Sequence, residues 1–318
     1  MALPTPTTTQ MARKRKGDPV HGWLIVDKPL GITSSAVVGK VKWLFNAAKA
    51  GHGGTLDPLA SGILPIAFGE ATKTVSYVMD GIKVYQFTIR WGEARSTDDV
   101  EGDVTQASDV RPDAAAIKAA LEFFVGDIQQ VPPVYSAIKV DGKRSYDLAR
   151  GGVDVKLQAR TIHVERFELI KCDDQDHATF EVVAGKGSYM RGLARDLALH
   201  LGTCGHIFAL RRLKVGPFDE KVAISLDKLE ALGHSAPLAD HLLAVETALD
   251  DIPALALTEE EARNLRHGRA VSILPVANRS SLTKVDPDAV YCALVDGKLV
   301  ALTKIVGGEI RPLRVINP

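Results

Sequence analysis

One carboxylate in a glycine-rich loop has the clearest potential for chemistry in this sequence. Asp57 lies in the segment GHGGTLDPLASG, with His52 five residues before it and Pro58 directly after it. The glycines allow backbone conformations that other residues avoid, and they let a second molecule approach closely. The pattern fits an acid presented on an open platform for catalysis. It also fits a tight turn whose Asp caps a neighbouring amide, and the loop alone does not separate the two interpretations.

The residues around this loop predict the elements that must position it. Residues 22–28 and 63–68 are short apolar runs typical of strands. Between them, Thr33 or Ser34 could cap a helix whose apolar residues recur at helical spacing. In residues 84–91 apolar and polar side chains alternate, which predicts a half-buried strand.

Further predicted elements continue this mixture of strands and helices. They are helices over about 71–79, 112–125 and 189–201, and a strand over 177–184. The order lacks the regular strand–helix–strand period of a doubly wound sheet. The sequence therefore predicts an α+β domain on a mixed, largely antiparallel sheet with flanking helices.

The last part of the chain predicts a separate small β-barrel. An acidic, alanine-rich connector occupies about 225–255, and Thr258 to Glu261 form a capping-box signature for a short helix closed by Gly268. The pair Asp296-Gly297 predicts a hairpin. The expected strands are the apolar runs 271–274, 290–295, 299–306 and 310–316. We expect such a module to bind a partner rather than to catalyse.

Composition restricts the class of protein. The 318 residues are 46% hydrophobic and 25% charged, which is typical of a globular protein. No apolar run reaches the roughly 18 residues that a membrane helix needs. The three cysteines lie far apart without a CxxC pair, which argues against a disulfide framework and a zinc site and suits a reducing compartment. We therefore expect a cytoplasmic protein.

Charge is unevenly distributed although 39 basic and 39 acidic residues balance. Acidic residues gather in 225–261, whereas basic residues gather in 139–166 and around Arg211. Clustered positive charge is the electrostatic footprint of a polyanionic partner. The first 19 residues, which are rich in Thr and Pro and contain the basic run 13–16, are expected to be a disordered basic tail.

Five segments, in order, resemble the bacterial tRNA pseudouridine-55 synthases, the TruB family. They are GWLIVDKPLGITS (22–34), GHGGTLDPLASGILPIAFGEATK (51–73), KVYQFTIRWG with Thr97-Asp98 and Gly102 (83–102), PPVYSAIKVDGKRSYDLARGG (132–152), and KGSYMRGLARDLALHLG through ALRRLKVGPF (186–218). The resemblance covers about residues 20–245. One departure is Gly53, where many members have threonine, and we expect it to loosen the loop.

The resemblance implies a division of the chain into three parts. A basic tail (1–19) precedes a catalytic domain (20–245) that carries a basic insertion at about 133–162. The small barrel (250–318) is similar to the PUA-type RNA-binding module of such enzymes. The basic segment 139–166 matches a mobile insertion that closes over the T-arm, and Asp141-Gly142 and Gly151-Gly152 predict a hairpin-like flap with hinges.

The implied activity is isomerisation of uridine 55 in the T-arm loop of tRNA to pseudouridine, with no cofactor and no metal. Asp57 matches the catalytic aspartate, a covalent nucleophile that attacks either C1′ of the sugar or C6 of the base. Arg191 matches the arginine that pairs with this aspartate. Tyr85 matches the active-site tyrosine, although its strand pattern would also fit a core residue.

Three further residues match substrate-binding positions of the family. Tyr189 and Leu210 match residues that line the uracil pocket. His52 matches a residue that contacts the displaced loop nucleotides, because a base inside a folded loop must be flipped out before it can react. The expected partner is the tRNA T-arm, with no membrane, no obligate protein partner and a monomeric chain.

Three alternatives stay open from the sequence. The chain could be an RNA-folding chaperone that has kept the synthase scaffold. It could be a related synthase that acts on another RNA with the help of partner proteins. An aspartate-nucleophile phosphatase is disfavoured because Leu59 occupies the position where that class has a second Asp.

Overall fold

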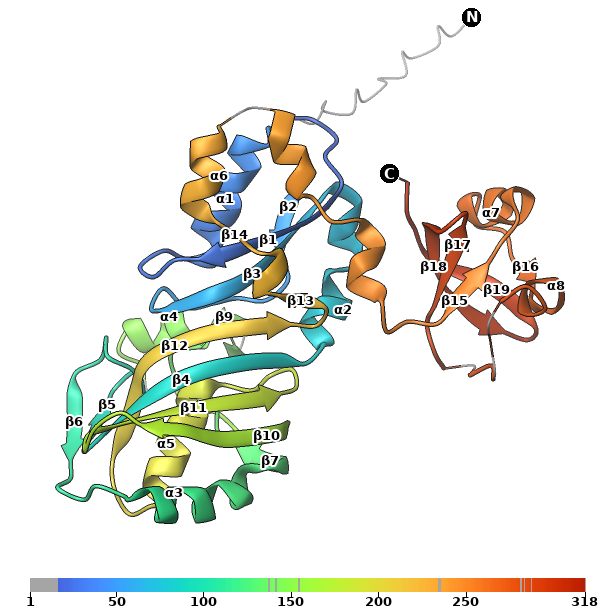
Figure 1. Cartoon of the computed structure of the whole chain (residues 1–318). Coiled ribbons are helices and arrows are strands. Elements are labelled where there is room, and N and C mark those ends of the chain that lie inside the picture. Colours follow the sequence, from blue (N-terminus) through green and yellow to red (C-terminus); the bar gives the residue numbers. More distant parts are fainter. Residues whose placement is uncertain are drawn as a thin grey trace, which may run out of the picture.

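The computed structural model describes residues 17–317 apart from 137, 141, 154, 234, 235, 281, 283 and 287. Most of the expected basic tail lies outside these residues, as does Asp141 of the expected flap turn. Figure 1 shows a large sheet with helices at both of its ends and a smaller sheet near the C-terminus.

The large sheet is mixed and mostly antiparallel, which confirms the expected fold class. In the described part of the chain its main path runs β14-β1-β3-β12-β4-β11-β10-β7, with β2 added beside β3 and β13 beside β12. The pairs β1–β14 and β3–β12 are parallel, and the other pairs are antiparallel. The strands are β1 (Gly22–Lys28), β2 (Ala50–His52), β3 (Ala60–Phe68), β4 (Lys83–Trp91), β7 (Gly126–Gln130), β10 (Arg160–Cys172), β11 (His177–Ala184), β12 (Gly205–Val215), β13 (Phe218–Asp219) and β14 (Ile224–Ser225).

Helices cover the sheet at its two ends (Figure 1). One end carries α1 (Ser34–Leu44) and α6 (Leu226–Leu232), and the other carries α3 (Ala114–Leu121) and α5 (Met190–His200). Thr33 caps α1, because its hydroxyl accepts a hydrogen bond from the Ala36 amide at 3.1 Å. The remaining elements of this part are η1 (Gly69–Lys73), α2 (Val75–Asp80), β5 (Glu93–Arg95), β6 (Val104–Ala107), η2 (Glu122–Phe124), β8 (Lys139–Val140), β9 (Lys143–Arg144), α4 (Ser145–Arg150), η3 (Glu220–Val222), η4 (Ala236–His241) and η5 (Val245–Leu249).

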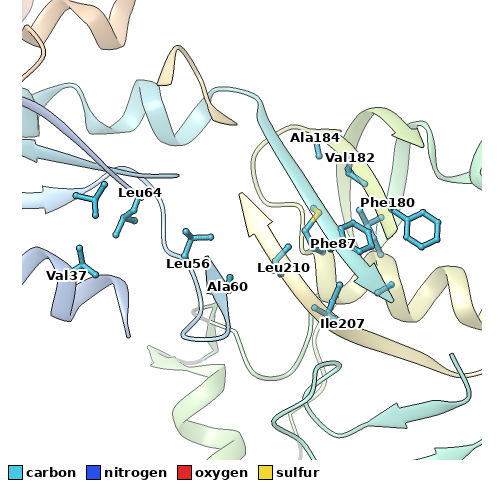
Figure 2. Packing of buried hydrophobic residues seen from close by; sticks show 14 of the residues in the cluster. Val37, Leu56, Ala60, Leu64, Phe87, Phe180, Val182, Ala184, Ile207 and Leu210 are labelled. Carbon is cyan, nitrogen blue, oxygen red and sulfur yellow. The ribbon is translucent and has the colours of Figure 1, made fainter. Parts of the chain in front are cut away.

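One hydrophobic cluster joins both ends of the large sheet. Figure 2 shows Val37 and Leu64 at one side of this cluster and Phe87 and Phe180 at the other, with Leu56 between them. Leu56 is 4% exposed and immediately precedes Asp57. The loop that carries the candidate nucleophile is therefore anchored in the main core by its own side chain.

The basic segment 139–166 is divided between two different parts of the fold, so the expectation that all of it belongs to a flap is wrong. Its first half forms the β8–β9 hairpin and α4, as expected of a flap. Arg160 and Arg166 instead lie in β10, which pairs with β7 and β11. The cause is the alternation of Ile162 and Val164, which are buried in the main core and draw this stretch into the sheet.

The C-terminal part is a curled, half-barrel sheet in the order β15-β17-β18-β19-β16. The capping box at Thr258 is present, and Asp296-Gly297 connects β17 to β18 with positive φ angles of 48° and 77°, as a tight hairpin turn requires. The elements are β15 (Ala254–Ala256), α7 (Glu259–Arg266), β16 (Val271–Ser272), α8 (Ile273–Ala277), β17 (Tyr291–Val295), β18 (Lys298–Val306) and β19 (Glu309–Val315).

Two details of this sheet differ from the expectation. The run 271–274 is a strand over Val271–Ser272 and then enters α8. Pro275 explains the change, because proline lacks the amide that a strand ladder needs but is tolerated in the first turn of a helix. Ala254–Ala256, assigned to the connector, instead forms a strand parallel to β17.

The C-terminal sheet is attached to the rest of the chain by a shared core. Trp23 and Leu249 pack in the same cluster as Leu299 and Leu302. Two hydrogen bonds hold the end of the chain to η1: one from Lys73 Nζ to the Val315 carbonyl at 2.8 Å, and one from the Asn317 amide to Glu70 Oε2 at 2.7 Å. The C-terminal sheet is thus joined to the rest of the chain through η1 and η5.

Gly62 offers a test of the parallel contact between β3 and β12. Its φ is +102°, and an added Cβ would lie 2.2 Å from the Arg212 carbonyl oxygen. We expect Gly62→Ala to lower the free energy of unfolding by about 3 kcal/mol or more, because backbone strain and a backbone clash act together. Urea unfolding followed by circular dichroism measures this change.

Gly202→Ala is the matched control. Its φ is +71°, and an added Cβ meets no described atom within 4 Å, so we expect only the strain cost of about 1 kcal/mol. Equal losses in the two variants would contradict the importance of the close approach at Gly62.

Candidate active site

The loop that carries Asp57 is fixed by hydrogen bonds on both sides. The Gly53 amide donates to the Pro65 carbonyl at 2.8 Å, and the Ala60 amide donates to the Asp57 carbonyl at 3.0 Å. Ser34 Oγ bonds both the amide and the carbonyl of Leu56, at 2.8 and 2.9 Å. The Asp57 side chain remains 40% exposed. A rigid main chain therefore presents an accessible carboxylate.

Lys28 is one of two buried cations that brace this loop. It is 0% exposed, and its Nζ donates to the carbonyls of Pro29 and Ile32, each at 2.9 Å, and of Pro58 at 3.4 Å. Burial lowers the pKa of Lys28 to about 8, the charge of Asp57 opposes this shift, and Arg212 adds to it. Lys28 joins the turn after β1 to the residue that follows Asp57.

Arg212 is the second cation and approaches the loop from β12. It is 2% exposed, and its guanidinium donates to the carbonyls of Ile63 at 2.8 Å, Gly54 at 2.9 Å and Thr55 at 3.4 Å. Burial lowers the pKa of Arg212, and the Tyr85 phenol beside it opposes the shift. Sequence reasoning missed Arg212 and Lys28, because each resembled a surface charge in a basic or turn segment.

Arg191 pairs directly with Asp57. Its Nη2 lies 2.8 Å from Asp57 Oδ2 and also donates to the Tyr135 carbonyl at 2.8 Å. Its Nη1 donates to the Thr97 carbonyl at 3.0 Å and lies 3.5 Å from the buried Asp99 carboxylate. With a side chain 7% exposed, Arg191 is held by three separate segments. A cation so fixed can orient the carboxylate as a ligand displaces water.

A second arginine of α5 strengthens this arrangement. Arg195 lies 3.0 Å from Asp98 Oδ2 and donates to the Val131 carbonyl at 2.7 Å. Burial raises the pKa of Asp98, whereas Arg195 and then Arg191 oppose the shift. The neighbouring carboxylates Asp98 and Asp99 thus anchor the first turns of α5. Sequence reasoning missed Asp99, although the run of polar residues after a short strand was the available signal.

A cavity of about 280 Å³ opens beside the Asp57–Arg191 pair, which is at the small end of ligand pockets. The structure brings five of the six candidate residues to its wall and leaves His52 outside. Its lining comprises Gly54, Thr55, Leu56, Asp57, Ala60, Met79, Lys83, Tyr85, Ser136, Gly185, Gly187, Ser188, Tyr189, Met190, Arg191, Leu210 and Arg212.

The walls of this cavity combine apolar surface with phenol groups. Leu210 is buried and pairs with Ala60 on one side and Phe87 on the other. The main chain of Tyr189 is fixed by the Gln130 amide, which accepts from its N–H at 2.9 Å and donates to its carbonyl at 3.0 Å. Burial raises the pKa of the Tyr189 phenol, so this group stays neutral at physiological pH.

His52 lies at the end of β2, two residues before the cavity lining begins. It is half-buried, and its Nδ1 has no partner among the described residues. Burial, followed by the charge of Arg212, lowers the pKa of His52, which favours a neutral ring. Its expected role at the displaced nucleotides stays a prediction.

The arrangement suits attack by a carboxylate on a small, partly planar ligand. Asp57 and Arg191 lie at the cavity wall, and Tyr85 and Leu210 offer flat or apolar surface to a ring. Within the described residues, no group of three or more His, Cys, Asp or Glu side chains is arranged to hold a metal ion. Among the same residues no helix is long and apolar enough to cross a bilayer.

Comparison with known proteins points to one family. Residues 42–190 match the family described as TruB family pseudouridylate synthase, N-terminal domain, and residues 191–250 match the tRNA pseudouridylate synthase B C-terminal domain. The protein named tRNA pseudouridine synthase B of Rhodospirillum rubrum is 60% identical over 96% of this chain and all of its own length. The protein of that name from Gluconacetobacter diazotrophicus is 56% identical, with the same coverage of both chains.

Solved structures share this fold. A chain in the crystal structure of a Cbf5-Nop10-Gar1 complex is 25% identical and superposes with a TM-score of 0.73, covering 94% of this chain and 85% of its own. A chain of the archaeal box H/ACA sRNP Nop10-Cbf5 complex superposes with a TM-score of 0.71 at 22% identity, covering 97% of this chain and 93% of its own. The second likeness concerns the fold alone.

Replacing Gly53 with threonine, the residue that many family members have at this position, tests whether the loop has room for a larger side chain. An added Cβ at Gly53 would lie 2.9 Å from Val78 Cγ1 and 3.4 Å from the Trp23 ring, so Val78 already fills this space. We expect Gly53→Thr to lower the free energy of unfolding by about 1–3 kcal/mol through overpacking, and Val78→Ala to recover part of the loss in the double variant. Chemical denaturation measures both.

Gly51→Thr provides the matched control, since an added Cβ at Gly51 meets no described atom within 4 Å. An equal loss of unfolding free energy in Gly51→Thr and Gly53→Thr would contradict the packing explanation. So would a double variant, Gly53→Thr with Val78→Ala, whose loss is the sum of the two single losses.

Lys28 makes stability depend on pH. Its folded pKa of about 8 lies below the ordinary 10.5, so the unfolded chain binds the proton more tightly. The unfavourable contribution is therefore complete below pH 8 and fades as pH rises toward 10.5. Relative to Lys28→Met, the wild-type chain should gain about 2 kcal/mol of unfolding free energy between pH 7.5 and 9.5.

The same pair of measurements on Lys40→Met, which removes an exposed lysine that pairs with Glu230, serves as control. Lys83 also has a pKa lowered by burial to about 8, but it is present in all three chains and cancels from the differences. If the difference in unfolding free energy between wild type and Lys28→Met stayed constant from pH 7.5 to 9.5, the lowered pKa of Lys28 would be refuted.

Proposed function

The chain belongs to the TruB family of pseudouridylate synthases, and from this we propose that it converts uridine 55 in the T-arm loop of tRNA to pseudouridine. The observation that carries the proposal is the Asp57–Arg191 pair at 2.8 Å in the wall of a cavity lined by Tyr85, Tyr189 and Leu210. Relatives that are 56–60% identical over nearly the whole chain carry the name tRNA pseudouridine synthase B, which supports tRNA as the substrate.

The proposed reaction is an isomerisation whose atoms balance without an added reactant. The bond between C1′ and N1 of uridine breaks, a bond between C1′ and C5 forms, C5 loses a proton, and N1 gains one. Asp57 acts as the nucleophile, at C1′ or at C6, and is released at the end. Arg191 holds the carboxylate in position while the bound base excludes water.

The remaining candidates hold the flipped base in this proposal. The cavity is too small for a paired stem, so the uridine enters it alone, extruded from the loop. Tyr85 offers a ring for stacking, and Leu210 offers an apolar surface. His52, outside the cavity and with a ring that favours the neutral form, fills the space that displaced nucleotides leave.

The proposed domain organisation is the division that the sequence predicts. Residues 20–245 form the catalytic domain, and residues 250–318 form a PUA-like module that binds RNA. The β8–β9 hairpin and α4 act as a flap over the T-arm, with Lys139 and Lys143 at phosphates, where they add affinity without reading sequence. The shared core and the hydrogen bond from Lys73 to Val315 support a single, pre-oriented binding surface for RNA.

Asp57→Asn tests the nucleophile and the substrate together. The assay uses an unmodified tRNA transcript with tritium at uridine C5, and the product is located by carbodiimide-blocked primer extension. We expect near-stoichiometric tritium release at one T-loop uridine with the wild-type chain. We expect none above background with Asp57→Asn, because an amide is not a nucleophile under these conditions.

Asp27→Asn is the matched control. Asp27 is also an arginine-paired carboxylate, with Arg211 at 3.0 Å from each of its oxygens, but it does not line the cavity. We expect this variant to keep tritium release. Tight tRNA binding without release by the wild-type chain would refute the isomerase and favour an RNA chaperone. Release at another uridine would keep the chemistry and refute the substrate assignment.

A further inference from the structure

The Ser136 hydroxyl is an unused polar group in the wall of the candidate active site. Ser136 is 5% exposed, and its Oγ is buried without a hydrogen-bond partner among the described residues. It also lines the cavity that contains Asp57. Because buried hydroxyls are nearly always paired, an orphan in a binding cavity indicates a partner that arrives with the ligand.

Two main-chain hydrogen bonds fix the position of Ser136. Its amide donates to the Val134 carbonyl at 3.0 Å, and its carbonyl accepts from the Tyr146 amide at 3.1 Å. The Ser136 hydroxyl interacts with the Tyr189 phenol and lowers the pKa of the phenol, against the larger effect of burial, but no geometrically complete hydrogen bond satisfies Ser136 Oγ. The orphan hydroxyl therefore stays beside a second hydroxyl in the cavity.

Ser136 is also next to the reacting groups. The carbonyl of Tyr135, the preceding residue, accepts from Arg191 Nη2 at 2.8 Å, and the same nitrogen bonds Asp57 Oδ2 at 2.8 Å. A base whose sugar carbon or C6 reaches Asp57 thus brings its ring near Ser136. The groups that a uracil ring offers at its edge are two carbonyl oxygens and the N3–H between them.

We propose that Ser136 Oγ donates a hydrogen bond to a ring carbonyl oxygen of the flipped uracil, an inference that rests on the function proposed above. A serine hydroxyl rotates freely and carries one donor, so it can follow an acceptor that shifts slightly. Ser136 is then a substrate-binding residue that positions the ring through a carbonyl acceptor, which uracil presents at both C2 and C4.

The geometry of the isomerisation makes one donor useful throughout the reaction. For C5 to replace N1 at the sugar, the ring must turn by half a revolution about the axis through N3 and C6. This rotation exchanges N1 with C5 and also exchanges the two carbonyl groups. The acceptor that Ser136 binds before the rotation is therefore replaced by an equivalent acceptor after it, and the hydroxyl holds both orientations.

Thio-substituted uridines test this bond directly. The substrates are T-arm stem-loop RNAs with uridine, 2-thiouridine or 4-thiouridine at the reacting position, because sulfur is a weak acceptor. On uridine, we expect Ser136→Ala to lower kcat/KM by roughly 3- to 10-fold, as loss of one neutral hydrogen bond implies. We expect the wild-type chain to discriminate against at least one thio-substrate by a similar factor, and Ser136→Ala to abolish that discrimination.

Thermal stability provides a second readout, because Ser136→Ala should lower activity without lowering the melting temperature. Because the Ser136 hydroxyl has no partner in the free protein, Ser136→Ala should leave the melting temperature unchanged or raise it. The matched control is Ser145→Ala, which removes a buried hydroxyl at the start of α4 whose Oγ is already bonded to the Val134 carbonyl. Ser145→Ala should lower the melting temperature and leave the thio-discrimination as in wild type.

Several results would overturn the inference. Unchanged thio-discrimination in Ser136→Ala would show that the hydroxyl does not bind a ring carbonyl. Loss of discrimination against a 2′-deoxyuridine substrate instead would assign the hydroxyl to the sugar. A wild-type chain that binds the uridine RNA but releases no C5 proton would refute the proposed function itself, and this inference with it.

Discussion

The interaction on which this site depends is the attachment of the Asp57 loop to two buried cations. Lys28 and Arg212 direct their donors to main-chain carbonyls of the loop and of neighbouring turns rather than to carboxylates. Burying a charge is costly, and the hydrogen bonds to these carbonyls offset part of that cost. Because the carbonyl partners carry no net charge, they do not neutralise the two cations. The positive potential of Lys28 and Arg212 therefore remains available to Asp57 and to an anionic ligand.

The contact between Arg212 and the Asp57 loop depends on the topology of the large sheet. Arg212 can reach Gly54 and Ile63 only because β12 lies parallel to β3, and Gly62 allows that contact by leaving no Cβ in the path of the Arg212 carbonyl. The same strand places Leu210 at the cavity. A single pairing of strands distant in sequence therefore brings together the loop, its brace and the apolar wall.

Local features were predictable from the sequence, and distant pairings were not. The capping box at Thr258, the Asp296-Gly297 turn and the alternation of residues 84–91 depend on near neighbours, and the structure confirms all three. The run 271–274 was misassigned because a short apolar run fits a strand or a buried helix equally well. The partners of Arg212 depend on strand order, which one sequence does not contain. The resemblance selected five cavity residues, and it covers Ser136 within the segment 132–152 but gave that residue no role.

The proposed flap and the proposed nucleophile, Asp57, are linked through one nitrogen atom. Arg191 Nη2 bonds both Asp57 and the carbonyl of Tyr135, at the point where the flap leaves the main fold. A movement of the flap root must therefore redistribute the hydrogen bonds of Arg191 and change how firmly Asp57 is held. Because Ser136 follows Tyr135 and its carbonyl holds the first turn of α4, ligand contact, flap position and orientation of the carboxylate depend on two adjacent residues.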